Sequence, residues 1–437
     1  MAFEAQRASS WCESSPGALN QPVNFGNNPF QTKGMPHLPA ITAGADGAGD
    51  RLVRVRGGRA KGDASSALLR PILSFAAALL FAAVFTGEAA AQCGGGGPFI
   101  GGPGPINCTT TLPTSTGNTQ RSSEALLLGL GTDFMQRLGA LSSFRTAASP
   151  GNNPQGGGAD AGSDQRYRAW LEGYGLSSRN GAQDDFSGDR RKTAGGVAGA
   201  GVTLAPGITA GLSVDQSRTK IDVTDLPQSG TINLTQIGGI VTFEKGPWNL
   251  GTTLVHGFGT VHSSRFDTVG EATASYHAKL WAAMAELSYY VSLPNNSRFV
   301  PKISFDWTRS HTNAFMETGG ATPVAGSSVT ATRVRMLIGG ELGHSWLLDR
   351  TIMDFAVYGK LIDNIRQNFG ALQITDTTGV NLPAFVTGVP ESNLGVDAGA
   401  SLSAKLTDTV RIYAVYDGRF RSNFTSHGGT LGAEFRF

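Results

Sequence analysis

Apolar and polar residues alternate along most of the chain from 166 to 437. The alternation is clearest in residues 207–215, 394–406 and 430–437. Because successive side chains of a strand point to opposite faces, each segment predicts a strand with one apolar face. The other face carries glycine, serine, threonine and charged residues.

This pattern predicts about twelve strands, which start near residues 166, 193, 207, 230, 247, 272, 297, 328, 350, 391, 410 and 428. The connections alternate between long and short. The long polar ones are 179–192, 224–231, 263–272, 313–328, 369–392 and 421–427, and the short ones are 205–206, 245–247, 293–297, 348–350 and 406–408. A soluble β-sandwich has no reason to keep this order, whereas outer-membrane barrels have short periplasmic turns and longer external loops. We therefore expect an all-β fold, a transmembrane antiparallel up-and-down β-barrel, with both ends of 166–437 on the periplasmic side.

Two sets of side chains follow from this topology. Aromatic residues near the short turns, together with Trp170 at the opening of the first strand, predict an interfacial girdle at the periplasmic end. Its members are Trp170, Trp248, Tyr289, Tyr290 and Trp346. Charged residues at inward positions predict the lining of the lumen, made of Arg333, Arg335, Glu341, Asp397, Lys405, Glu434 and Arg436. These charges either line a wet pathway or pair across the interior without one.

Composition agrees with a barrel. Glycine, at 60 of 437 residues, is about twice as frequent as usual, and charged residues are only 16% where about 25% is typical. Mean hydropathy is −0.10. These values suit neither a helical soluble enzyme nor a helical membrane protein with repeated apolar runs of about 20 residues.

One strongly apolar run, 71–85, follows basic residues and precedes a small-residue site. This order predicts a signal peptide over 69–91, with cleavage between Ala91 and Gln92. A membrane anchor is the alternative, although the run is short for one. Residues 1–68 are then either a long basic region of the signal or the product of a start codon placed too early.

Charge and cysteines narrow the partners of the mature chain. Eight of the 35 Lys and Arg and six of the 33 Asp and Glu precede Gln92, so 27 of each remain. A neutral chain does not favour a nucleic-acid partner. Cys93 and Cys108 predict a disulfide that closes a small loop in an exported segment. A lipid-modified Cys93 is the alternative, but Gln92 replaces the small residue that lipoprotein signals carry. Nothing in the sequence predicts a metal or a cofactor.

Four stretches also suggest a family: 168–175, 246–250, 299–305 running to 317–320, and 416–420 continuing to 432–437. In order and spacing, 166–437 resembles the C-terminal translocator domain of bacterial autotransporters (type V secretion). The resemblance implies a twelve-stranded barrel in the outer membrane of a Gram-negative bacterium. It implies that Phe435 and Phe437 form the signal read by the outer-membrane barrel assembly machinery. It also implies the Sec translocon, periplasmic chaperones and outer-membrane lipid as partners; oligomeric state stays undetermined.

In this family the barrel assists export of the N-terminal passenger of its own chain and retains a helical linker in the pore. Residues 122–165 contain a candidate linker, a helix over 122–145 that Ser122 or Ser123 would cap, followed by a Gly-rich loop. Its apolar residues recur at helical spacing on one side: Leu127, Leu130, Phe134, Leu138 and Leu141. A helix of 24 residues, at about 1.5 Å per residue, would cross the membrane thickness. A periplasmic or surface helix is the alternative.

The passenger is unusually short. Residues 92–121 are rich in Gly, Pro and Thr, predict disorder, and cannot bury a core. The Asn pair at 152–153 resembles the site at which some family members sever the passenger, but Pro154 favours a turn. We therefore expect a barrel that exports or displays its own short N-terminal segment and loops, with a porin-like or structural barrel as the alternative.

An outer-membrane hydrolase is the remaining hypothesis. His262 and His311 fall near the external ends of their strands, where Ser263 or Asp306 would have to approach them. No nucleophile motif or phosphate-binding loop accompanies them. We therefore expect no enzymatic activity.

Overall fold

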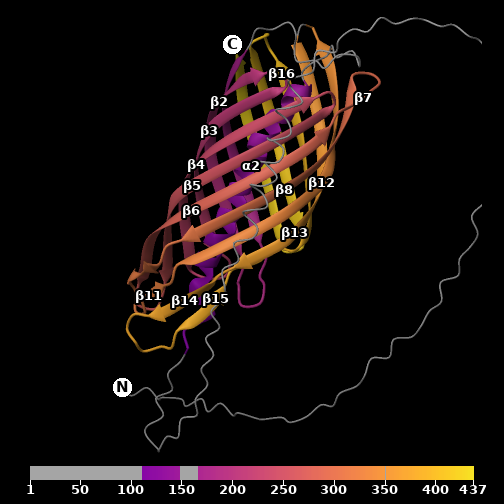
Figure 1. Cartoon of the computed structure of the whole chain (residues 1–437). Coiled ribbons are helices and arrows are strands. Elements are labelled where there is room, and N and C mark those ends of the chain that lie inside the picture. Colours follow the sequence, from indigo (N-terminus) through magenta and orange to yellow (C-terminus); the bar gives the residue numbers. More distant parts are fainter. Residues whose placement is uncertain (1–110, 148–165, 350) are drawn as a thin grey trace, which may run out of the picture. The chain divides into compact units, whose positions relative to one another are not determined.

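The computed structural model describes residues 111–147, 166–349 and 351–437, and for 140–147 the backbone alone. Twelve long antiparallel strands form one closed ring, in which β1 pairs with β18 and β6 pairs with β8 (Figure 1). They are β1 (Tyr167–Asn180), β2 (Asp189–Ala205), β3 (Ile208–Val223), β4 (Gln228–Lys245), β5 (Trp248–Phe266), β6 (Glu271–Tyr289), β8 (Ser297–Thr312), β12 (Val329–Leu348), β13 (Thr351–Phe369), β16 (Leu394–Lys405), β17 (Val410–Arg421) and β18 (Phe424–Arg436). The barrel expected from the alternation is confirmed.

The strand starts agree with the sequence-based prediction to within four residues, the largest differences being at β2 and β18. The turn chemistry explains the accuracy at the short connections. Asn295 and Asn296, between β7 (Val291–Leu293) and β8, both have positive φ, at 59° and 54°. Asparagine tolerates this conformation, which the tight turn between the paired residues Leu293 and Ser297 requires.

Two long connections were predicted as polar loops, and this was wrong. They contain a second, four-stranded sheet in the order β15 (Ala384–Thr387), β14 (Ala371–Asp376), β11 (Val324–Gly326) and β9 (Phe315–Met316). β10 (Thr318–Gly319), from the same region, pairs with β6. Each strand has only two to six residues, too few for alternation to stand out from loop sequence. Leu372, Ile374 and Val386 are buried in the same apolar cluster as the helix residues.

The chain enters the barrel as the 3₁₀ turn η1 (Thr114–Gly117) and continues as the helix α2 (Asn118–Ala147). The helix therefore begins four residues before Ser122, and neither Ser122 nor Ser123 is its cap. Ser123 lies within the helix, where its Oγ donates to the carbonyl of Thr119 at 2.8 Å. Residues 118–121, expected before the helix, are thus part of it. Within the described residues, no helix is both long and apolar enough to span a membrane.

The helix lies inside the barrel and packs against β3, β4, β5, β6, β8 and β12 (Figure 1). Its first turn contacts the long connections, because Asn118 Nδ2 donates to Ser187 Oγ at 3.3 Å and Arg121 pairs with Asp185 at 2.9 Å. Twenty-one residues later, Gly139 lies beside Met284, near the short-turn end of β6. The chain thus runs through the lumen from the long-loop end to the short-turn end.

Candidate functional site: the helix in the barrel lumen

One side of α2 is apolar and packs on the barrel wall. Leu127, Leu130, Phe134 and Leu138 are each at most 1% exposed, as the helical spacing predicts; the side chain of Leu141 lies outside the described residues. The wall is shaped to receive them. A Cβ placed on Gly238 of β4 would come within 2.5 Å of Leu138 Cδ1 and 2.9 Å of Phe134 Cε1. Glycine at 238 therefore provides the space that these two side chains fill.

The opposite side of the helix is polar and faces charged residues of the wall. Arg419 of β17 forms an ion pair with Asp133, and its Nη2 donates to Gln136 Oε1 at 2.8 Å. One turn from Asp133, the guanidinium carbon of Arg137 lies 3.5 Å from the centre of the Tyr174 ring on β1. This is cation–π geometry. The helix is thus held by an apolar contact on one side and by charge-assisted contacts on the other.

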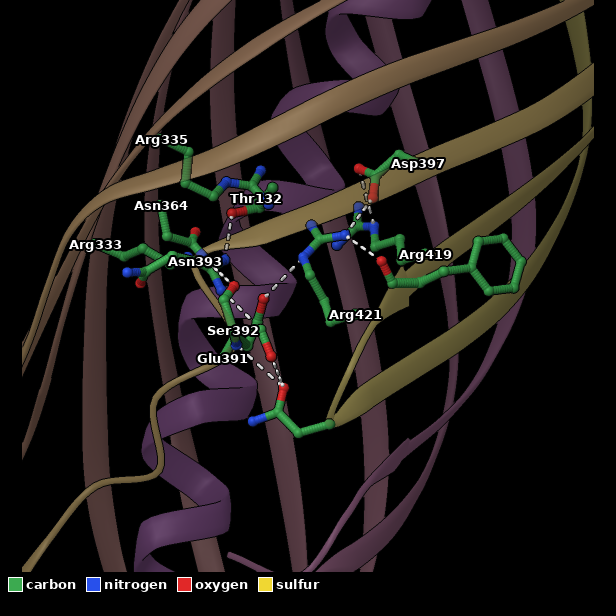
Figure 2. A network of polar contacts seen from close by, with 12 residues as sticks. Thr132, Arg333, Arg335, Asn364, Glu391, Ser392, Asn393, Asp397, Arg419 and Arg421 are labelled. Atoms are coloured by element: carbon green, nitrogen blue, oxygen red, sulfur yellow. Dashed lines mark hydrogen bonds and ion pairs between the residues drawn. The ribbon is translucent and has the colours of Figure 1, made fainter. Parts of the chain in front are cut away.

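Arg333 of β12 joins the helix to the loop that precedes β16. Its Nη1 donates to Glu391 Oε1 at 2.6 Å, and its Nη2 donates to Thr132 Oγ1 at 3.0 Å and to the Leu128 carbonyl at 3.2 Å. Figure 2 shows Arg333, Thr132 and Glu391 within one polar network that reaches Arg421 and Asp397. Arg333 is 2% exposed. A buried guanidinium is stable only with such partners, since removing it from water is costly.

All seven predicted lumen charges form ion pairs. Arg335 pairs with Asp306, Glu341 with Lys302 and Arg298, Asp397 with Arg421, Glu434 with Arg411 and Arg436, and Lys405 with Asp408, in addition to Arg333 with Glu391. Lys405 differs from the others because Asp408 is 93% exposed at a short turn. The pairing alternative is the one that the structure favours.

Sequence reasoning missed several members of this network. Asp306 and Arg419 occupy inward positions of β8 and β17, so the same alternation that selected Arg335 would have found them. Asp133 and Glu391 carry no such signal. One lies on a helix and the other on a loop, and only the closed barrel brings them to the wall.

The aromatic prediction was wrong for Trp170. This side chain is 1% exposed and points into the lumen, because Trp170 shares the inward face of β1 with Glu172 and Tyr174. It lies over Gly199 of β2, where a Cβ would approach Trp170 Cζ2 to 2.2 Å. A large ring packed over a glycine of the neighbouring strand fills the space that the glycine leaves.

The remaining predicted girdle aromatics lie near the short turns. Trp248, Tyr289 and Trp346 are 50%, 36% and 37% exposed, and Trp248 meets Tyr289 edge-on with ring centres 4.7 Å apart. Tyr290 is half-buried, and its backbone N–H donates to the Pro247 carbonyl at 2.7 Å. The prediction did not include Trp281, another aromatic residue that is exposed on the outer wall. Trp281 lies eight residues before Tyr289 on β6, a distance of about 26 Å along the strand.

The histidine hypothesis was wrong in its geometry. His262 is exposed on the outer surface, whereas Ser263 is buried and points inward. His311 is likewise exposed and shares a 3.0 Å hydrogen bond with Thr330, while Asp306 is buried against Arg335. Residues an odd number of positions apart on one strand point to opposite faces, so His262 cannot meet Ser263 and His311 cannot meet Asp306. The described residues contain no group of His, Cys, Asp and Glu arranged to hold a metal ion.

The C-terminal aromatics lie at the seam of the barrel. Phe435 and Phe437 are 40% and 65% exposed. The backbone of Phe437 exchanges hydrogen bonds with Tyr167 at 2.9 and 3.0 Å, and the two rings stack with centres 6.2 Å apart. Ala91, Gln92, Cys93, Cys108 and the Asn pair at 152–153 lie outside the described residues.

Comparisons with known proteins agree with this geometry. Residues 169–417 match the family described as "Autotransporter beta-domain". The translocator domain of the autotransporter NalP from Neisseria meningitidis is similar in structure, with a TM-score of 0.52, 15% identity, and coverage of 63% of this chain and 90% of that one. The beta domain of the Bordetella autotransporter BrkA gives a TM-score of 0.47 at 18% identity, covering 62% and 100%. No curated protein sequence matches the chain.

Proposed function

Because the chain belongs to the autotransporter beta-domain family, we propose that it exports its own N-terminal segment. The chain is an outer-membrane β-barrel translocator of a Gram-negative bacterium. The supporting observation is the direction of α2. The helix begins among the long connections and ends near the short turns. Since long loops are external in such barrels, we infer that the segment before Thr111 lies outside the cell.

The proposed route begins in the cytoplasm. The Sec translocon recognises 69–91, and cleavage between Ala91 and Gln92 releases the chain into the periplasm. Periplasmic chaperones keep it unfolded until the barrel assembly machinery reads Phe435 and Phe437. The barrel then closes around the helix with the segment before it outside. What is displayed is a short segment from Gln92 onward, with a Cys93–Cys108 disulfide, together with the external loops.

The contacts of the helix favour a translocator over a porin-like barrel. A porin needs a continuous aqueous path, whereas here α2 occupies the lumen and Arg333 and Arg419 bind it from the wall. These buried cations all have acidic partners. We therefore assign Arg333 and Arg419 to holding the helix and not to selecting a solute, and we propose no catalytic step.

Protease access on intact cells tests the proposal. An epitope tag after residue 95 should be removed by added protease, as should a control tag in the loop 377–383. A tag in the short turn at 295–296 should resist until the outer membrane is permeabilised. A tag at residue 95 that is protected on intact cells, while the loop tag is cut, contradicts export.

A further inference from the structure

Five basic side chains gather on the outer wall of the barrel. Arg179 lies on β1, Arg190 and Lys192 on β2, and Arg218 and Lys220 on β3, near the long-loop ends of these strands. All five are exposed and occupy outward positions, with buried or half-buried neighbours on either side in the alternation. We call these five residues the basic patch.

The strand register forces like charges together within the basic patch. Arg179 lies directly opposite Arg190, and Lys192 lies directly opposite Lys220. Residues opposite each other have Cβ atoms about 4.5–5.5 Å apart, and like charges in that position are destabilising. Arg218 lies directly opposite Ala194, which is two residues from Lys192 on β2, so Arg218 and Lys192 are diagonal neighbours.

Acidic residues compensate little of this charge. Among the ion pairs of the described residues, none includes a member of the basic patch. The register places one acidic residue directly opposite a member of the basic patch: Asp222 lies across from Arg190. Repulsion of this kind favours a bound anion, and guanidinium and ammonium groups suit phosphate oxygens best.

The basic patch adjoins the apolar outer surface of the same strands. Going toward the short turns, beyond Gln216 on β3 and beyond Ser177, Gly175 and Gly173 on β1, the outward residues are apolar. They are Val214 and Leu212 on β3 and Leu171 on β1, which are 47%, 69% and 58% exposed. Apolar residues exposed on a barrel wall face acyl chains. The patch therefore lies at the external boundary of the hydrocarbon region. On the other side of β1, the outward positions of β16, β17 and β18 contain no Lys or Arg.

We propose that the basic patch binds the phosphate groups of a phosphorylated lipid in the outer leaflet, whose acyl chains lie along Leu171, Leu212 and Val214. The lipid supplies the counter-charge that the register of β1, β2 and β3 lacks. This site is separate from the lumen, and it rests on the outer-membrane location but not on export of the N-terminal segment. Free phosphate shares the headgroup chemistry but offers no acyl chains to this surface.

The test uses the full chain in phosphatidylcholine vesicles with and without diphosphoryl lipid A. The wild-type urea midpoint should rise with the lipid, whereas Lys192→Gln/Lys220→Gln should bind it at least about tenfold more weakly. Lys245→Gln removes a similar exposed cation from a short turn and should behave as wild type. Arg179→Gln/Arg218→Gln should repeat the loss with a different pair. Without the lipid, Lys192→Gln should leave the midpoint unchanged or raise it, because a repulsion is removed.

Three results would overturn the proposal. One is an equal shift of the midpoint in wild type and both double variants. Another is an equal shift with a dephosphorylated lipid, which would remove the phosphate from the argument. The third is an equal shift with inorganic phosphate, which would leave an anion site that makes no use of the apolar wall.

Discussion

Replacing Arg333 by Met should loosen the seating of α2 without opening the barrel wall. Arg333 Nη2 makes two hydrogen bonds to the helix, at 3.0 Å to Thr132 Oγ1 and at 3.2 Å to the Leu128 carbonyl. Its contact with Glu391 at 2.6 Å does not involve the helix and persists whether or not the helix is seated. Only the first two bonds count toward the equilibrium between seated and released helix.

A hydrogen bond to a charged group contributes about 1.5–3 kcal/mol. Because one nitrogen serves both acceptors, we expect the seated state to lose about 2 kcal/mol in total. At 1.4 kcal/mol per tenfold, the released fraction should rise about thirtyfold. Thr132→Val removes one acceptor with little change of shape, so its effect should be smaller and in the same direction.

Conductance of the purified barrel in planar bilayers measures this fraction, because a released helix leaves the lumen open. Openings should become about thirtyfold more frequent in Arg333→Met. Arg366→Met, an exposed cation on the outer wall of β13, should match wild type. Gel migration before and after heating verifies that each variant is folded. An Arg333→Met barrel that is folded and opens no more often than wild type would refute the reasoning.

Three further predictions concern packing and pH. Gly238→Leu should overfill the wall beneath Leu138 and Phe134 and destabilise the seated state of the helix by about 1–3 kcal/mol, which would be measured as more frequent openings. Gly239→Ala should not have this effect, because its Cβ would lie 3.4 Å from Leu212 Cδ2. Trp170→Ala should lower the free energy of unfolding by about 3–5 kcal/mol in urea titrations and Trp248→Ala by clearly less, because the first ring is buried and the second is half exposed; equal losses would contradict the inward placement of Trp170. Asp267 accepts hydrogen bonds from the backbone N–H groups of Val269, Gly270, Ala321 and Thr322, which hold its pKa at about 2 against an ordinary 3.8. Because its pKa is lowered, the ionised Asp267 carboxylate stabilises the loop. This stabilisation is fully present above the ordinary pKa and is lost as pH falls through about 2. Exchange of the Ala321 amide should therefore stay slow at pH ~3 and become fast in Asp267→Ala.

The sequence was sufficient to predict the strands of the barrel wall, because the alternation within each strand shows which residues face inward and which face outward. Alternation in 394–406 separates Asp397 from Val396 without knowledge of any partner strand, and the order of long and short connections gives the topology. Trp170 was misplaced because its position at the start of β1 was given more weight than the inward face that it shares with Glu172 and Tyr174.

Contacts between distant segments were beyond this reasoning. The sequence predicts a helix with an apolar stripe, but its place inside the barrel depends on partners such as Gly238, Arg333 and Arg419, which are 100 to 286 residues away from Leu138 and Asp133. The sheet formed by β9, β11, β14 and β15 has strands too short to show a period. The basic patch becomes visible only when the register places Lys192 opposite Lys220.

The direction of the chain through the lumen is the claim on which the proposed function depends, and cysteine labelling tests it most directly. In a chain with Cys12→Ser, Cys93→Ser and Cys108→Ser, a single Thr111→Cys should react with a membrane-impermeant maleimide on intact cells. Val380→Cys in an external loop should react as well, and Asn295→Cys in a short turn should react only after permeabilisation. If Thr111→Cys behaves like Asn295→Cys, the chain enters the lumen from the periplasm and the account is contradicted.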